Sequence, residues 1–334
     1  MPPYENADTR PHTTNMKEMM TMKNVVKKIG MMLLTMVIVS FFAFLAFQVI
    51  PGDPTIKLLS SDATAEAVAA LRAELGLDRP FFTRYFEWVL HALQGDFGTS
   101  YVYSMPVAQL LNGKLGVTAL LTAIAFVLIV LVSLPVGLFA ASRQGGWLDR
   151  ALTVLGQVVM AVPPFVVGIL LTLVCGLILH WFDPGAFIAP AQSFWSSVGY
   201  LLYPAVAIAL PRIAMTVKML RASILNQMER DYVRTARSRG STKDRILRKH
   251  VLRNAIIPVI TFIATSMAEI VASSIVIEQV FAIPGIGVLL LSSINNRDFP
   301  VVQALVMILV LWVVLVNFLA DLLYQYMDPR IRLR

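Results

Sequence analysis

The chain has 334 residues, of which 57% are hydrophobic and 14% are charged, and its formal net charge is +8 at pH 7. Average soluble domains are about 45–50% apolar and about 25% charged, so this composition excludes a soluble globular protein and predicts a polytopic membrane protein. The basic residues lie in short segments between apolar runs, which argues against nucleic-acid binding. The single cysteine, Cys175, excludes an intrachain disulfide, and the four histidines show no metal-ligand spacing.

Six apolar runs are each long enough to cross about 30 Å of hydrocarbon, which takes about 20 residues. The sequence therefore predicts an all-α membrane protein with six transmembrane helices. The first run is longer than the apolar core of a signal peptide, which has about 7–15 residues. Pro163 and Pro164 lie inside the third run and predict a kink there. The predicted helices are residues 29–50, 117–141, 151–181, 199–217, 255–277 and 301–324.

Basic residues predict the orientation of these helices. Segments on the N-terminal side of the membrane hold 22 of the 28 Lys and Arg residues, and segments on the other side hold 6. Such an excess is typical of the cytoplasmic side, so both termini are predicted to be cytoplasmic. Whether residues 1–21 belong to the mature protein stays open. The predicted divisions are a cytoplasmic segment 1–28, a first helix 29–50, an external loop 51–116, a five-helix core 117–324 containing a cytoplasmic loop 221–254, and a cytoplasmic tail 325–334.

The external loop carries the pattern of two short amphipathic helices that lie on the outer membrane surface. Asp62 or Thr64 is the expected N-cap of the first, and Gly76 is its expected stop. An aromatic-rich helix follows Pro80. Packing against the bundle is the simpler interpretation of this loop, and a docking surface for an external partner is the alternative.

The cytoplasmic loop has a pattern of helix, glycine, turn and helix. Residues 226–239 combine an apolar stripe with four arginines, Gly240 ends the segment, and residues 241–252 form a second helix before the fifth transmembrane run. A short helix presented in this way suits a groove on a soluble partner. A solvated basic loop that touches lipid head groups is the alternative.

Catalytic motifs are missing from the sequence. Its Gly-Lys pair, Gly113-Lys114, is followed by Leu115, and Ala108 stands where a phosphate-binding loop needs its first glycine. There is also no GxSxG, HExxH or Cys/His cluster. We therefore expect a chain that is not an enzyme, that binds no metal and that holds no cofactor itself.

The stretch Asp231–Gly240 resembles the EAA loop of ABC importer permeases. Ala236 and Gly240 match the general motif, whereas Arg234 and Thr235 replace its Glu and Ala in the manner of the peptide and nickel branch. Further segments resemble the same branch in order and spacing, so the likeness covers about residues 23–334. These segments are residues 49–54, 75–80, 95–98, 253–258, 278–287, 296–303 and 321–332.

The resemblance implies a type I importer permease, similar to the "B" subunit of dipeptide, oligopeptide or nickel importers. It implies a heterodimer with a second homologous permease, two ATP-binding subunits that carry ATP-Mg, and an external solute-binding protein, in a bacterial or archaeal cytoplasmic membrane. In that family the loop docks onto an ATP-binding subunit. The residues assigned to this contact are Asp231, Tyr232, Thr235, Ala236, Arg239 and Gly240.

Charged residues inside membrane helices are costly and are therefore functional candidates. Glu269 lies mid-way along the fifth helix and Glu278 lies nearer its outer end, and both are candidates for the translocation path. A hydrogen-bonded carboxyl packed against a neighbouring helix is the alternative for Glu269. Arg212 is expected to extend toward the cytoplasmic head groups.

Two alternatives concern the transported solute and the class of transporter. Peptides are the first expectation, because no helix carries a Met/His stripe for a bare metal ion, and a nickel or other metal chelate is the second. An ATP-independent channel or secondary transporter is a remote alternative, because the Pro163-Pro164 interruption has no counterpart in the other half of the chain. The sequence leaves the solute and any preference for peptide length open.

Overall fold

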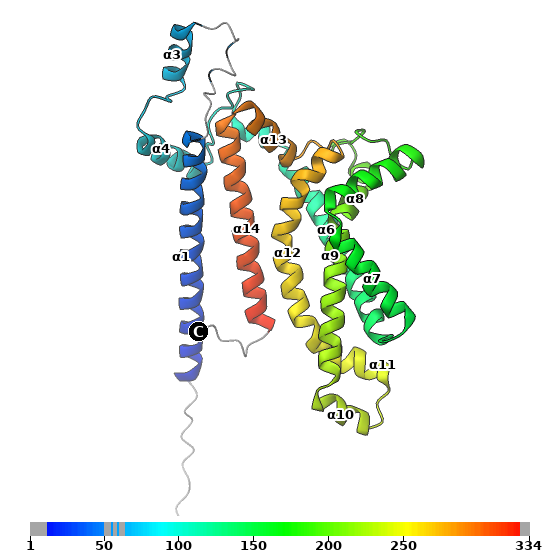
Figure 1. The fold of residues 1–334 in the computed structure, drawn as a ribbon. Helices are drawn as coiled ribbons and strands as arrows, with labels where there is room; N and C mark the ends of the chain where they lie inside the picture. Colours follow the sequence, from blue (N-terminus) through cyan, green and yellow to red (C-terminus); the bar gives the residue numbers. More distant parts are fainter. Residues whose placement is uncertain (1–11, 50–54, 56–58, 60–63, 328–334) are drawn as a thin grey trace, which may run out of the picture. The chain divides into compact units, whose positions relative to one another are not determined.

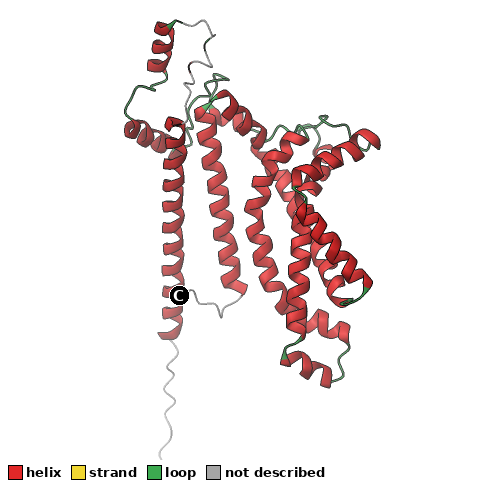
Figure 2. Cartoon of the chain, in the orientation of Figure 1, coloured by secondary structure: helices red, strands yellow, loops and turns green. Residues whose placement is uncertain are grey.

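The computed structural model describes the backbone of residues 12–49, 55, 59 and 64–327. The chain divides into two compact units, one within residues 1–50 and one from residue 51 onward, and each is described by itself. The predicted N-cap Asp62, the segment 51–54 and residues 328–334 of the tail lie outside the described residues. Figure 2 shows that the described part is built of helices joined by short loops, which confirms the all-α prediction.

The first unit is one helix, α1 (His12–Val49), whose apolar section is Val26–Ala46. The second unit begins with short helices outside the predicted spans and continues with long apolar helices, as Figure 1 shows. Its elements are α3 (Ala65–Glu74), α4 (Phe81–Leu93), α5 (Val107–Leu111), α6 (Lys114–Ser142), α7 (Trp147–Ala161), α8 (Pro164–Leu171), the π-helix η1 (Thr172–Ile178), α9 (Phe194–Met228), α10 (Asp231–Ser238), α11 (Lys243–Arg245), the π-helix η2 (Ile246–Val251), α12 (Leu252–Val280), α13 (Ile286–Asn296) and α14 (Phe299–Met327).

Five described segments are long and apolar enough to cross a membrane, and a bent pair makes a sixth if it counts as one span. This confirms the expectation of six transmembrane elements. Each straight segment contains or overlaps a predicted run. They are Val26–Ala46, Val107–Ser142, Phe194–Met228, Lys243–Val280 and Phe299–Leu323.

The third predicted helix is broken rather than merely kinked. α7 and the segment Pro164–Ile178 meet at 98°. A residue that precedes proline is pushed out of the helical region, and here two such residues are adjacent. Val162 and Pro163 both have extended backbone angles, so α7 ends before them and α8 begins afresh with Pro164 in its first turn.

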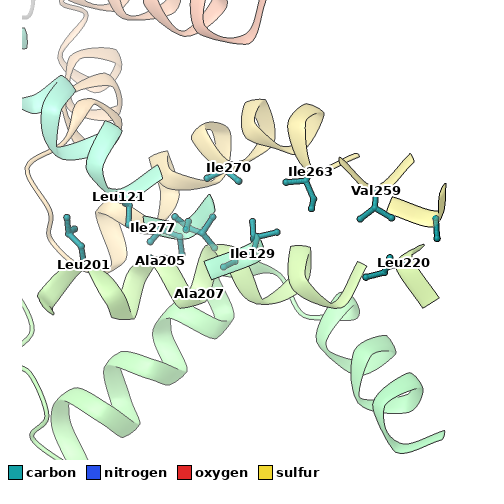
Figure 3. Close-up of a cluster of buried hydrophobic side chains, with 14 of the residues drawn as sticks. Leu121, Ile129, Leu201, Ala205, Ala207, Leu220, Val259, Ile263, Ile270 and Ile277 are labelled. Carbon is teal, nitrogen blue, oxygen red and sulfur yellow. The ribbon is translucent and has the colours of Figure 1, made fainter. Parts of the chain in front are cut away.

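The core of the second unit lies between α6, α9 and α12 (Figure 3). α6 and α9 pack closely because small residues line their contact, as is common between membrane helices. Ala205 and Ala207 of α9 are fully buried. Gly137 of α6 lies so close to Leu220 of α9 that an added Cβ would stand 2.8 Å from its Cδ2.

The two ends of the bundle are made by different elements. α10 and α11 lie at one end, here called the α10 end, and α13 lies at the opposite end, here called the α13 end (Figure 1). The two ends of the bundle are therefore formed by different parts of the sequence.

The two short helices expected in the loop 51–116 are present as α3 and α4. Thr64 caps α3, because its hydroxyl accepts a hydrogen bond from the N–H of Ala67 at 3.3 Å. Gly76, with φ of +66°, follows its last turn as expected. α4 exposes an apolar stripe, which suits a helix that lies on a membrane surface. The stripe is formed by Phe82, Phe86, Leu90 and Leu93.

We expect Gly137→Leu to destabilise the protein, because the new side chain must push Leu220 out of the α6–α9 contact. Overpacking of this kind costs about 1–3 kcal/mol. Gly116→Leu, on the same helix, is the matched control, because Gly116 is exposed and a Cβ added there meets no atom within 4 Å. Thermal unfolding of the purified protein in detergent measures both. Equal midpoints for the two variants would contradict the close packing.

Candidate functional site

The predicted docking helix is α10, and one of its faces is attached to the bundle. Val233 is 1% exposed, and Tyr232 and Ala236 pack beside it against the core. The Tyr232 hydroxyl also donates a hydrogen bond to Oε1 of Gln227 at 2.9 Å. α10 is therefore held as part of the bundle rather than suspended on a loose loop.

The opposite face of α10 is exposed. Asp231, Thr235, Arg239 and Gly240 all lie on the surface. Gly240 has a φ of +76°, and the N–H of the next residue, Ser241, bonds to the carbonyl of Ala236 at 3.2 Å. The backbone changes direction sharply at Gly240, so α10 ends here and its C-terminal end stays exposed.

The sequence thus predicted six contact residues, and the structure divides them into two groups. Asp231 and Thr235 lie on the free face of α10, Arg239 and Gly240 are exposed just after its last turn, and Tyr232 and Ala236 face the bundle. The free face also carries exposed Arg234 and Arg237, so its charge is predominantly positive. This face is exposed and predominantly positive, which suits contact with an acidic surface.

Two further contacts tie the α10 end together. The Lys243 ammonium, on α11, donates to the carbonyl of Ser142 at the end of α6, at 3.2 Å. The Ser223 hydroxyl of α9 donates to the carbonyl of Ala255 near the start of α12, at 2.8 Å. These contacts join α11 to the end of α6, and α9 to the start of α12.

A buried ion pair that the sequence analysis missed joins α7 to α9 on the side chains of Asp149 and Arg221. The Arg221 guanidinium donates Nε to Oδ1 of Asp149 at 2.6 Å and a terminal nitrogen to Oδ2 at 2.8 Å. The Asp149 side chain is 4% exposed and also accepts the N–H of Gly145 at 3.0 Å. A lone acidic residue just after the Gly145-Gly146 turn was its only signal in the sequence.

A second ion pair lies deeper in the bundle, between Arg212 of α9 and Glu269 of α12. The prediction that Arg212 extends toward the head groups is wrong, because its guanidinium turns to this carboxylate instead. The Arg212 side chain is 24% exposed and that of Glu269 is 56% exposed. The pair therefore borders open space rather than the packed core.

Glu269 belongs to a polar stripe along α12. Thr261, Thr265, Glu269 and Ser273 follow one another at intervals of four residues, so they share one face of the helix. All four are at least partly exposed in this chain. A polar stripe with a charge at its centre is unfavourable against lipid, so this face must meet water or another protein surface.

Glu278 occupies a different environment from the one expected of a path-lining residue. Its side chain is fully buried. The carboxylate accepts hydrogen bonds from the Thr118 hydroxyl at 2.5 Å, from the N–H of Gly287 at 2.7 Å and from that of Val288 at 3.4 Å. Gly285 and Gly287 leave space for it, because a Cβ at either position would collide with the carboxylate. In this structure Glu278 joins α6, α12 and α13 and is not exposed.

The loop 95–106 is held to the α13–α14 corner by a second buried carboxylate, that of Asp298. It accepts the Ser100 hydroxyl at 2.5 Å and the N–H of Tyr101 at 3.0 Å. Burial raises the pKa of the Tyr101 phenol. Glu278 and Asp298 together fix the α13 end.

The described residues contain no group of three or more His, Cys, Asp or Glu side chains that could hold a metal ion. What the described parts do contain is a bundle of apolar helices, the basic helix α10 at one end, and charged side chains on an exposed face of α12. The apolar helices are those of a multi-pass membrane protein.

The chain belongs to the family of binding-protein-dependent transport system inner membrane components, whose model matches residues 133–333. The model of the N-terminal part of such membrane components matches residues 20–122. The family is defined by transport across the inner membrane, which confirms the expectation of a multi-pass transport subunit rather than an enzyme.

Curated relatives match almost from end to end. A protein named as a peptide ABC transporter permease from Sinorhizobium fredii is 34% identical over 92% of this chain and 98% of its own length. A peptide transport system permease from Brucella abortus matches at the same level. The glutathione transport system permease GsiC of Salmonella choleraesuis is 33% identical over the same shares.

A solved structure supports the fold. A chain of the MetNI methionine ABC transporter, in an inward-facing crystal form, superposes with a TM-score of 0.53 at 19% identity. The match covers 66% of this chain and 97% of that one. Together with the family match, this likeness in fold confirms the permease architecture predicted from the sequence.

We expect Thr118→Val to lower the free energy of unfolding by about 1–3 kcal/mol, because it leaves buried polar groups unpaired. Besides its bond to Glu278, the Thr118 hydroxyl accepts the N–H of Ile286 at 3.0 Å.

Thr122→Val is the matched control one turn along α6. Its hydroxyl is equally buried but donates to the carbonyl of Thr118 in its own helix. Unfolding in detergent compares the two variants, and a Thr122→Val protein as unstable as Thr118→Val would contradict the junction's importance.

Proposed function

We propose that this chain forms half of the translocation path for di- and oligopeptides in an ABC importer and that α10 is its coupling helix. The observation that carries the proposal is α10 itself, which is fixed to the core by one face and exposes the other. The relatives named as peptide and glutathione permeases support the class of solute.

The partners in this proposal are a second homologous permease in a heterodimer, two ATP-binding subunits and an external solute-binding protein. ATP-Mg is held by the ATP-binding subunits and not by this chain. The family description supports the need for a binding protein. The exposed positive face of α10 suits an acidic groove on an ATP-binding subunit.

In the proposed orientation the α10 end and both termini are cytoplasmic. The excess of basic residues on that side supports this orientation. The apolar stripe of α4 then lies at the outer membrane surface, where it suits the boundary between head groups and acyl chains.

The proposed mechanism is a rigid-body transfer from α10 into the bundle. Closure of the ATP-binding subunits displaces α10, and Val233 carries this displacement into the core. The Lys243 contact with Ser142 carries it to α6. A packed junction of this kind has discrete arrangements rather than a continuum, which is what switching between two states requires.

Import of nickel or a metal chelate is the less favoured solute class. The relatives reported above are named for peptides or glutathione. Glu269 and Arg212 together offer one carboxylate and one guanidinium, which suits an organic ion better than a transition metal.

Thr235→Tyr is expected to uncouple transport, because a bulky ring on the free face of α10 prevents docking while the attached face stays intact. Stimulation of ATP hydrolysis by the loaded binding protein should fall by about tenfold or more in the reconstituted transporter, the effect of losing about 1.4 kcal/mol of contact.

The matched control is Lys249→Tyr, an exposed position in the same loop outside α10. Its ATP hydrolysis should stay near the wild-type rate. Normal stimulation in Thr235→Tyr would remove α10 from the proposed contact.

The solute class is tested by uptake into proteoliposomes that contain the full transporter. Labelled alanine peptides of two to five residues should accumulate in an ATP-dependent manner, and nickel ions supplied with or without a chelating amino acid should not. Accumulation of nickel without peptide uptake would favour the alternative.

A further inference from the structure

Arg212 and Glu269 form the one described ion pair that joins two membrane-spanning helices at mid-length and still borders open space. The carboxylates of Asp149 and Glu278 are, by contrast, buried, and each accepts hydrogen bonds from several donors. Glu269 is 56% exposed, so its carboxylate retains capacity for a further hydrogen-bond donor. This pair is therefore placed to exchange partners.

The surroundings of the pair are suited to a polar solute. Thr265 lies one turn before Glu269 on the exposed face of α12, and Ser273 lies one turn after it. Their hydroxyls donate within the helix, to the carbonyls of Thr261 and Glu269, which leaves oxygen lone pairs facing outward. The face thus offers acceptors around one anion and one cation.

We propose that Arg212 and Glu269 are the site at which the path receives a dipolar solute, with the solute's carboxylate on Arg212 and its ammonium on Glu269. A short peptide with free ends carries both groups. The proposal rests on the proposed function and adds to it the residues that recognise the two ends of the solute.

Charge balance favours this exchange. An ion without a counter-ion inside a membrane protein is unfavourable, so either residue alone would be an obstacle. A dipolar solute replaces each partner by a group of the same sign, so no charge is left without a counter-ion. When the solute leaves, the pair forms again, so the site is reset and does not hold its solute permanently, as transport requires.

A purely structural role of the ion pair leads to a different expected result. If the ion pair serves only to hold α9 to α12, as the Asp149–Arg221 pair holds α7 to α9, no solute group touches it. Blocking one end of a peptide would then have the same effect on protection in the wild type, in the Arg212 variant and in the Glu269 variant.

The test is a protection assay on the assembled transporter, without the solute-binding protein and its own preferences. A Thr265→Cys reporter is labelled with a maleimide, and a Ser273→Cys reporter repeats the measurement. The native Cys175 is buried. The probes are trialanine with free ends, its N-acetylated form and its C-amidated form, each titrated to find the concentration that halves the labelling rate.

Free trialanine should protect the reporter, and blocking either end should raise the half-protection concentration by about tenfold or more, since each end loses a hydrogen bond to a charged group. In Glu269→Gln, N-acetylation should no longer matter while C-amidation still does. In Arg212→Gln the two dependences should be reversed. Asp149→Asn should keep the wild-type pattern.

Two results overturn the proposal: no protection by free trialanine up to its solubility limit, or equal protection by all three peptides in every background. Peptide uptake by the wild-type transporter is measured in parallel and tests the proposed function separately. If uptake is normal and protection is absent, only the role of this pair fails. If no peptide is taken up, the proposed function itself fails.

Discussion

An ion in the hydrocarbon part of a bilayer has no water to solvate it, and this constraint organises the described charges of the bundle. Glu269 is held by Arg212, and Glu278 is held by a hydroxyl and two backbone N–H groups. Each partner comes from another element of the chain. Solvating the charge therefore also fixes one helix against the next.

These contacts fix some parts of the bundle more firmly than others. Glu278 and Asp298 fasten the α13 end through buried hydrogen bonds, and the small residues between α6 and α9 keep those two helices in close contact. The polar face of α12 in between has no such cover in this chain. Under the proposed function, an opening along this face of α12 leaves the two junctions intact.

Local patterns were sufficient to predict the long helices, Thr64 as one of two candidate caps of α3, and the glycine that follows α10, because each depends on a few neighbouring residues. They were not sufficient for contacts between distant segments. The partner of Glu278, Thr118, lies 160 residues away, and nothing around either residue indicates the other. The Pro163-Pro164 pair predicted a kink, but the 98° angle depends on what α7 and α8 pack against.

The division of α10 into two faces shows why a motif and a contact surface are different things. A resemblance treats the residues of Asp231–Gly240 alike, because it compares letters along the chain. On a helix of 3.6 residues per turn, positions 232, 233 and 236 fall on one side and 231 and 235 on the other. The first group fixes the helix to the bundle and the second is free to meet a partner. A change at Ala236 therefore alters the attachment of α10 as well as any contact, whereas a change at Thr235 alters the contact while leaving the attachment in place.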